Sequence, residues 1–247
     1  MSNKHNHQLN LEAIPGDYQY TALRKKNSIQ SQWHKNRHNL IDSLKFLKND
    51  DHLLDVGCGS GNVIITFSKK VKTATGIDNS AQCISFLKKQ ITDKKLTNTY
   101  ALKMDILNLS LKKTDYTKIV MTEVIEHFSE KEGRNILRSL HKHLKPGGKI
   151  LITTPNYKSS WALMEPLMDI LNLSPKLWGD QHLMKYNPHR LAHLLNLAGF
   201  TVEKKGTLNL ISPFIALFSP KIADRISFLE FKFFSFGNLL YIVGIKK

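Results

Sequence analysis

Cysteine is scarce in this chain of 247 residues, which contains only Cys58 and Cys83. Two cysteines cannot form the disulfide framework of a small secreted domain, so the composition fits a reducing compartment. No apolar run reaches the ~18 residues that a membrane-spanning helix needs. The first residues, MSNKHNHQLN, lack the apolar core of a secretory signal peptide. These absences predict a cytoplasmic protein and leave a peripheral membrane contact open.

Acidic residues are also few, 20 against 36 lysines and arginines, which gives a formal net charge of +16. This excess fits binding to nucleic acid, contact with an anionic membrane, or acidic substrates. It fits equally a lysine-rich surface exposed to water, because the lysines are scattered singly and in pairs along the chain. Charge alone therefore selects none of these.

The rest of the sequence predicts one domain over residues 28–247, preceded by a flexible N-terminal leader over residues 1–27. Helical spacing of apolar residues predicts a first helix from about residue 28 to 47. Short apolar runs then alternate with helical patterns. The predicted strands are 52–56, 73–77, 98–103, 118–122, 148–154, 200–205 and 239–245, and the predicted helices between them are 61–69, 80–91, 130–144 and 188–198. This alternation predicts an α/β fold, a Rossmann-like, mostly parallel sheet with helices on both faces.

A glycine-rich turn, Asp55-Val56-Gly57-Cys58-Gly59-Ser60-Gly61, follows the first predicted strand. Glycine lets a backbone approach a ligand closely. Dinucleotide-binding folds use a G-x-G-x-x-G spacing around a pyrophosphate, whereas the spacing here is G-x-G-x-G. The preceding Asp55 would repel a pyrophosphate but suits a cationic ligand, such as the sulfonium and amino groups of S-adenosylmethionine. Asp55, Gly57, Gly59 and Gly61 are therefore candidate cofactor-binding residues.

Candidate cofactor contacts also follow the next three predicted strands. They are Asp78 and Asn79 after the second strand, Asp105 and Ile106 after the third, and Met121 and Thr122 at the end of the fourth. We expect Asp78 to accept hydrogen bonds from both ribose hydroxyls and Asp105 to accept one from the adenine amino group. Ligands of open α/β sheets bind at the carboxyl ends of the strands, so the four strand ends predict one site.

The sequence Glu123-Val124-Ile125-Glu126-His127 comes directly after the fourth strand. On a helical turn, positions i, i+3 and i+4 share one face, so Glu123, Glu126 and His127 are predicted to converge as catalytic residues. Together with His182 they are candidate ligands of a divalent metal, Mg, Mn or Zn. Alternatively, His127 is a metal-free general base. A third interpretation gives the glutamates only structural hydrogen bonds.

These motifs together resemble class I S-adenosylmethionine-dependent methyltransferases over about residues 28–205 and again in the last strand. The resemblance implies a seven-stranded sheet in which the final strand, 239–245, is antiparallel. The chain looks most like the ubiquinone-pathway O-methyltransferases, in which an arginine before the first strand reaches the cofactor carboxylate. Arg37 matches that position, whereas Thr122 stands where the family usually has methionine. An E-x-x-E-H motif with a later histidine also occurs in small-RNA 2′-O-methyltransferases, and both families are described as metal-using.

Two apolar inserts, about 159–174 and 207–236, interrupt the regular alternation. Such segments are typical of lids, substrate-binding walls or surfaces that touch a membrane, although ordinary core packing also explains them. They favour O-methylation of a small aromatic or lipid-like acceptor. An RNA-modifying methyltransferase is the alternative that the positive charge favours, but no basic-aromatic RNA-binding patch is evident. A cofactor-binding protein without activity is a third possibility, and the oligomeric state is left open.

Overall fold

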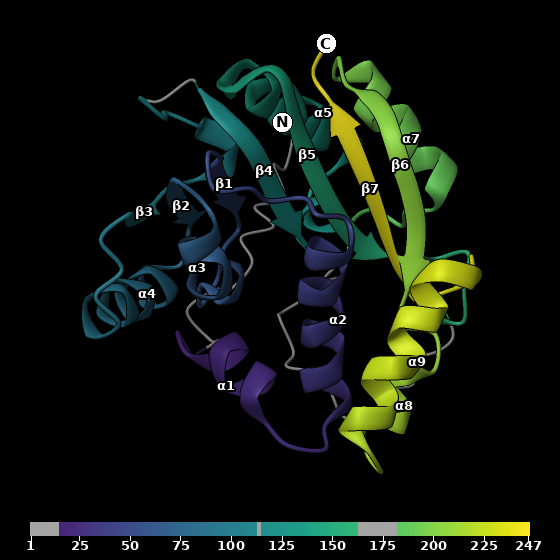
Figure 1. Cartoon of the computed structure of the whole chain (residues 1–247). Helices are drawn as coiled ribbons and strands as arrows, with labels where there is room; N and C mark the ends of the chain where they lie inside the picture. Colours follow the sequence, from purple (N-terminus) through teal and green to yellow (C-terminus); the bar gives the residue numbers. More distant parts are fainter. Residues whose placement is uncertain (1–14, 113–114, 163–181) are drawn as a thin grey trace, which may run out of the picture.

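The computed structural model describes residues 15–112, 115–162 and 182–247, and a twisted sheet runs through its middle (Figure 1). Its strands are β1 (His52–Val56), β2 (Thr73–Asp78), β3 (Thr99–Lys103), β4 (Tyr116–Thr122), β5 (Leu144–Pro155), β6 (Thr201–Leu208) and β7 (Leu239–Ile245). The helices are α1 (Tyr18–Arg24), α2 (Ile29–Ser43), α3 (Asn62–Phe67), α4 (Ala81–Asp93), α5 (Glu130–His143), α7 (Pro188–Leu197), α8 (Ser212–Ile215) and α9 (Pro220–Phe233). Short 3-10 turns are η2 (Ser68–Lys70), η3 (Ile106–Asn108) and η4 (Ile125–His127).

The seven strands lie in the order β3-β2-β1-β4-β5-β7-β6. Strands β1 to β5 pair in parallel, and β7 lies between β5 and β6, antiparallel to both. The predicted α/β fold with an antiparallel last strand is therefore confirmed. Because β1 to β4 run in one direction, their carboxyl ends meet at a single edge of the sheet, where the glycine turn also lies.

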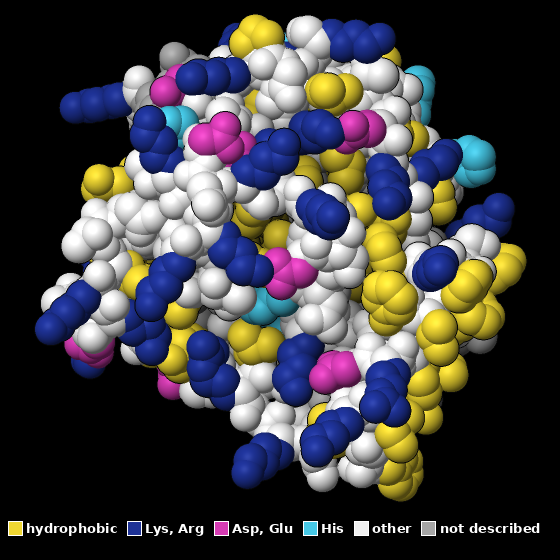
Figure 2. Space-filling view, in the orientation of Figure 1, with side chains coloured by type: hydrophobic (Ala, Val, Ile, Leu, Met, Phe, Trp, Pro, Cys, Tyr) yellow, Lys and Arg dark blue, Asp and Glu magenta, His cyan; other side chains and the backbone are white. Residues whose placement is uncertain are grey.

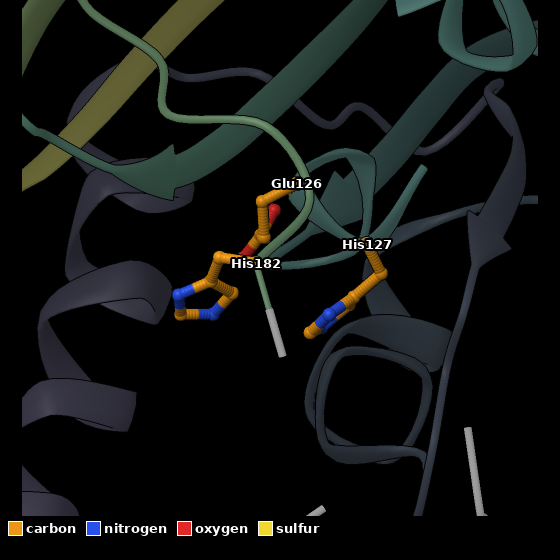
Figure 3. A group of neighbouring side chains, drawn as sticks. All are labelled: Glu126, His127 and His182. Carbon is orange, nitrogen blue, oxygen red and sulfur yellow. The ribbon is translucent and has the colours of Figure 1, made fainter. Parts of the chain in front are cut away.

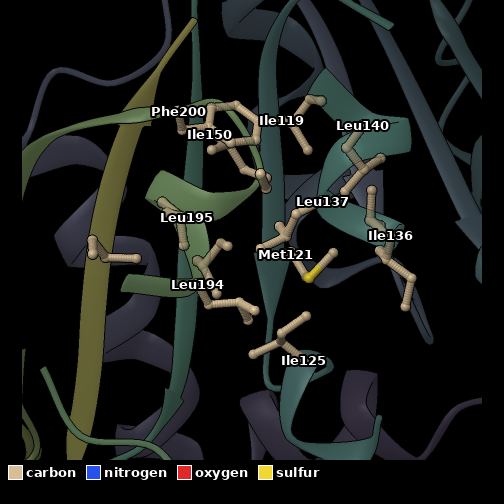
Figure 4. Packing of buried hydrophobic residues seen from close by; sticks show 14 of the residues in the cluster. Ile119, Met121, Ile125, Ile136, Leu137, Leu140, Ile150, Leu194, Leu195 and Phe200 are labelled. Carbon is tan, nitrogen blue, oxygen red and sulfur yellow. The ribbon is translucent and has the colours of Figure 1, made fainter. Parts of the chain in front are cut away.

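Alternating side chains of each central strand enter two different cores. On one face, Leu54, Ile119 and Ile150 pack with residues of α5 and α7 (Figure 4). On the other face, Leu53, Val120 and Leu151 pack with residues of α2, α3 and α4. Both faces of the sheet are thus covered, as predicted, because strand side chains alternate in direction while the strands themselves are apolar throughout.

Polar caps fix where the helices begin. Ser28 accepts a hydrogen bond from the backbone of Ser31 at the start of α2, and Ser80 does the same for α4. Ser129 and Glu132 form a reciprocal capping box at the start of α5. Each such cap stabilises a helix by about 1 kcal/mol, so the helices begin close to the positions that the sequence predicts.

Part of the predicted flexible leader, residues 1–27, is helical, so the prediction is wrong for that part. Helix α1 occupies Tyr18–Arg24 and packs against α2. The helix has only seven residues, too few for apolar periodicity to mark it. Residues 1–14 lie outside the described residues, as does most of the predicted insert at 159–174.

Candidate active site

The glycine turn after β1 has a backbone that only glycine adopts readily. Gly57, Gly59 and Gly61 have φ angles of +67°, +49° and +80°. A Cβ on Gly57 would lie 2.4 Å from Val124 Cγ2, so a side chain there would also clash. The predicted turn is therefore present, and it opens α3 directly.

Asp78, at the end of β2, holds this turn in place. Its carboxylate accepts hydrogen bonds of 2.8 Å from the backbone N–H groups of Gly59 and Ser80. Burial raises the pKa of Asp78 above its usual value, and these backbone bonds oppose that rise. The predicted ribose-binding carboxylate thus lies beside the glycine turn, while the neighbouring Asn79 is exposed.

Asp55 is buried near the carboxyl end of β1, close to Asp78 of the neighbouring strand β2. Burial raises the pKa of Asp55 to about 7; the charge of Asp78 adds to the rise and that of Arg37 opposes it. Its Oδ2 atom has no hydrogen-bond partner among the described residues. A buried carboxylate without a partner is costly unless a cation or donor comes to it. The site therefore fits a positively charged ligand at this position, as the sequence predicts.

Of the other predicted cofactor residues, Asp105, Ile106 and Thr122 lie at or just after the carboxyl ends of β3 and β4, whereas Met121 points into the core. Asp105 caps η3 by accepting hydrogen bonds from the Leu107 backbone and the Asn108 side chain. Ile106 is the first residue of that turn, and Thr122 is the last residue of β4. Met121 is fully buried, and its side chain packs in the core with α5.

Helix α1 lies against the glycine turn, a contact that sequence reasoning missed. Ser60 Oγ donates a 2.7 Å hydrogen bond to the carbonyl of Gly16, and Asn62 Nδ2 donates one of 2.7 Å to the carbonyl of Gln19. The acceptors are backbone carbonyls, which carry no sequence signal. The cofactor edge is therefore bordered by the N-terminal helix as well as by the sheet.

Glu123 and Arg37 form an ion pair at the end of β4. The distance from Arg37 Nη1 to Glu123 Oε1 is 3.0 Å, and Trp33 Nε1 donates a 2.9 Å hydrogen bond to the same oxygen. His34 is buried in contact with Arg37. Helix α2 thus brings Arg37 beside Glu123, together with Trp33, and the contact of Arg37 with a cofactor carboxylate stays a prediction. The spacing of four residues, which places both on one helical face, was the available signal for Trp33.

The predicted helical turn over Glu123, Glu126 and His127 does not form. Glu123 has a φ angle of +55°, in the left-handed region, and the 3-10 turn η4 begins only at Ile125. A left-handed, non-glycine residue is strained, and here its N–H is held by the carbonyl of Thr153 at 2.9 Å. The side chain of Glu123 therefore goes to Arg37 instead of joining Glu126.

Glu126, His127 and His182 do come together, although 55 residues separate the two histidines (Figure 3). One potential ligand atom from each lies within 4.8 Å of the others. Glu126 is fully buried; its Oε2 accepts a 3.0 Å hydrogen bond from Thr154, and its Oε1 has no partner among the described residues. Burial raises the pKa of Glu126, while His127 and His182 oppose that rise.

Two further contacts hold His182 beside Glu126. The hydroxyl of Tyr157 forms a 2.8 Å hydrogen bond with His182 Nδ1, and the N–H of Met184 donates to the carbonyl of Glu126 at 3.0 Å. The rings of His127 and His182 are 5.3 Å apart between centroids. Tyr157 was missed, because only its position after β5 places it near the site.

Comparison with known proteins identifies the class that this fold and site define. The sequence model of a family described as "Methyltransferase domain" matches residues 29–205, more than half of the chain. The chain belongs to this family, the class I S-adenosylmethionine-dependent methyltransferases, and the cofactor that the family implies is S-adenosylmethionine.

Individual relatives are distant and differ in the atom they methylate. The chain is 26% identical over 160 residues to a ubiquinone biosynthesis O-methyltransferase of Hydrogenovibrio crunogenus, covering 64% of this chain and 62% of that protein. It is 28% identical over 107 residues to (S)-tetrahydroprotoberberine N-methyltransferase of Eschscholzia californica, covering 42% of this chain and only 30% of that protein. The fold is also similar to the crystal structure of magnesium protoporphyrin IX methyltransferase from Synechocystis PCC 6803, with a TM-score of 0.63, 12% identity and 93% coverage of both chains.

Proposed function

We propose that this protein transfers the methyl group of S-adenosylmethionine to a hydroxyl oxygen of a small aromatic or lipid-like acceptor. The observation that carries the proposal is the group formed by Glu126, His127 and His182, in which the first two residues follow β4 and His182 comes from the segment before α7. A neutral hydroxyl is a poor nucleophile. Methyl transfer to it therefore needs groups that remove its proton or lower its pKa. A carboxylate and two imidazoles facing one point supply such groups.

In the first version of the proposal, the three residues hold a divalent metal. The donor set, one carboxylate and two imidazoles, suits zinc or manganese better than magnesium, which prefers oxygen ligands. The buried Oε1 of Glu126, which has no partner among the described residues, fits such an ion, because a cation would compensate its lost hydration. When bound, the metal would lower the pKa of the acceptor hydroxyl. Tyr157 fixes the ring of His182, and Arg37 keeps Glu123 away from the ligand set.

In the second version, His127 accepts the acceptor proton without a metal. An imidazole titrates near neutral pH and can take a proton from a hydroxyl within hydrogen-bond reach. Glu126 then stabilises the imidazolium that forms, because the two side chains interact electrostatically. Both versions place the same residues at the acceptor. They differ in whether a metal ion or His127 promotes loss of the hydroxyl proton.

The test begins with the acceptor. Purified protein and methyl-labelled S-adenosylmethionine are incubated with catechols, isoprenoid quinone precursors, lipids and small RNAs. We expect label on an oxygen of an aromatic or lipid-like compound. Label on a ribose 2′-hydroxyl would favour the RNA-modifying alternative, which the net charge of +16 supports. Label on nitrogen or carbon would reject O-methylation.

The second experiment separates the two versions. With a metal, prolonged chelation abolishes turnover, added zinc or manganese restores it, and Glu126→Gln loses bound metal and activity while keeping donor affinity. Without a metal, chelation has no effect, the rate rises with pH as the general base loses its proton, and His127→Ala loses about 10²–10⁴-fold in rate. Glu203→Gln is the matched control, since Glu203 pairs with Lys149 on the surface. Full activity of both site variants in chelator would leave positioning alone to explain catalysis.

A further inference from the structure

An exposed apolar face covers α8, α9 and the segments beside them. Ten of the fifteen exposed large hydrophobic side chains of the described residues lie between positions 211 and 236. They are Ile211, Phe214, Leu217, Phe218, Ile222, Phe228, Leu229, Phe233, Phe234 and Phe236, with Phe218 as much as 86% exposed. Figure 2 shows hydrophobic side chains gathered over these two helices, with lysines and arginines beside them. Soluble surfaces rarely concentrate large apolar side chains in this way.

Helix α9 is amphipathic, but its strongly apolar side faces the solvent and its more polar side faces the protein. The residues it buries fully against the protein are Ala223, Ser227 and Glu230, which are small or polar, and the only apolar ring it packs on the core is the half-buried Phe231. The apolar residues Ile222, Leu229 and Phe233 are exposed. At 3.6 residues per turn these three share one face, so the helix turns its apolar stripe to the solvent. Packing against the sheet does not account for this stripe.

A basic stripe runs directly beside the apolar one. Lys221, Arg225 and Lys232 are all exposed and are spaced at i, i+4 and i+11 on α9. The two acidic residues of the helix are both engaged by groups of the same chain, Glu230 in a buried position and Asp224 in an exposed one. Asp224 accepts a 2.8 Å hydrogen bond from Gln32 of α2, and the buried Glu230 accepts from the backbone at the start of α8. The outward face of α9 therefore carries positive charge and apolar surface together.

We propose that the α8–α9 face binds the surface of an anionic lipid membrane, with the apolar stripe in the headgroup region and the basic stripe on the phosphates. A second copy of the chain is a poorer partner. A symmetric pair would place two basic stripes on one interface, while the acids of α9 are engaged within their own chain. Among the described residues, no helix is long and apolar enough to cross a membrane. The proposal goes beyond the proposed function and holds for any acceptor.

Vesicle sedimentation tests this inference on the full chain. We expect binding to vesicles of phosphatidylcholine mixed with phosphatidylglycerol and much weaker binding to pure phosphatidylcholine. The triple variant Lys221→Gln, Arg225→Gln, Lys232→Gln should lower partitioning on the order of 100-fold and lose its salt dependence, since each cation contributes about 1 kcal/mol. The variant Phe218→Gln, Leu229→Gln, Phe233→Gln should lose binding to both vesicle types.

The matched control changes three exposed apolar residues elsewhere, Tyr100, Leu102 and Leu197, to glutamine and should bind vesicles like the wild type. Circular dichroism and donor affinity report whether each variant is folded. Phe218→Trp gives a second measurement, a blue shift of its added fluorescence with anionic vesicles. No binding of the wild type to anionic vesicles, or equal loss in the control, would overturn the proposal. A wild-type dimer that becomes monomeric in the apolar variant would assign the face to a second copy instead.

Discussion

The buried Asp55 carboxyl predicts that donor binding weakens as the pH falls through 7. The pKa of Asp55 in the free protein is about 7, so only about 3% is ionised at pH 5.5 and about half at pH 7. A sulfonium ligand favours the ionised form and lowers this pKa, so binding releases the proton. If the ionised form alone binds, affinity increases about 15-fold over this interval.

Calorimetric titration of the protein with S-adenosylmethionine at several pH values measures this affinity. Repeating the titration in two buffers of different ionisation enthalpy gives the number of protons released on binding. The interval ends at pH 7 because the α-amino group of the ligand itself titrates near 8. Asp55→Asn should bind more weakly and with a flatter pH dependence. A slope that remains in Asp55→Asn would be assigned to the neighbouring Asp78, whose pKa burial also raises. An unchanged slope in Asp55→Asn, or no proton release by the wild type, would refute the reasoning.

The same carboxyl links pH to the stability of the free protein. The pKa of Asp55 is higher in the folded chain than its usual value of 3.8, so folding favours the protonated form. This contribution is complete below about pH 4 and is lost as the pH rises through 7. A rise of about three pKa units corresponds to about 4 kcal/mol at most. Thermal unfolding should therefore show Asp55→Asn gaining stability relative to the wild type above pH 7.

Two other variants test the rest of the cofactor edge. Asp78→Ala should lower the affinity for S-adenosylmethionine by roughly 30–150-fold, which corresponds to about 2–3 kcal/mol. The substitution removes the expected ribose contacts and the hydrogen bond that holds the turn at Gly59. Unchanged affinity in calorimetry would exclude Asp78 from the site. Arg37→Ala should weaken the binding of S-adenosylmethionine about 10–100-fold, because the contact with the ligand carboxylate is lost. Methylthioadenosine lacks that carboxylate and should bind the wild type and the variant equally. A parallel loss of affinity for both ligands would assign Arg37 a purely structural role.

Much of the fold could be predicted because two local signals agree along the chain. The apolar runs of β1, β4 and β5 mark buried strands, and the helical spacing of apolar residues marks the helices between strands. The antiparallel β7 was different, because its direction followed from the family resemblance and not from its own residues. Helix α1 could not be predicted, since it is held by backbone carbonyls of Gly16 and Gln19.

The site was predictable where it depends on strand ends and not where it depends on backbone conformation. Asp55 and Asp78 lie where the strand pattern places them. The prediction that Glu123 and Glu126 converge depended on a regular helical turn. Glu123 itself has a left-handed φ angle, and this interrupts the turn. A φ angle of this kind carries no reliable signal in a glutamate, because the strain is tolerated only when neighbours such as Thr153 hold it.

Helix α2 illustrates the largest gap between the sequence pattern and the structure. Its apolar residues predicted a helix that packs by one stripe, but Gln32, Asn36 and Arg37 are also buried. Arg37 contacts Glu123 at the site, while Asn36 donates hydrogen bonds of 2.6 and 3.0 Å to Asn209 and Ser212 near α8. Buried polar residues are stable only with partners, and those partners lie more than 80 residues away in the chain. Periodicity detects apolar burial, so a helix that joins the cofactor edge to α8 through polar side chains is evident only in three dimensions.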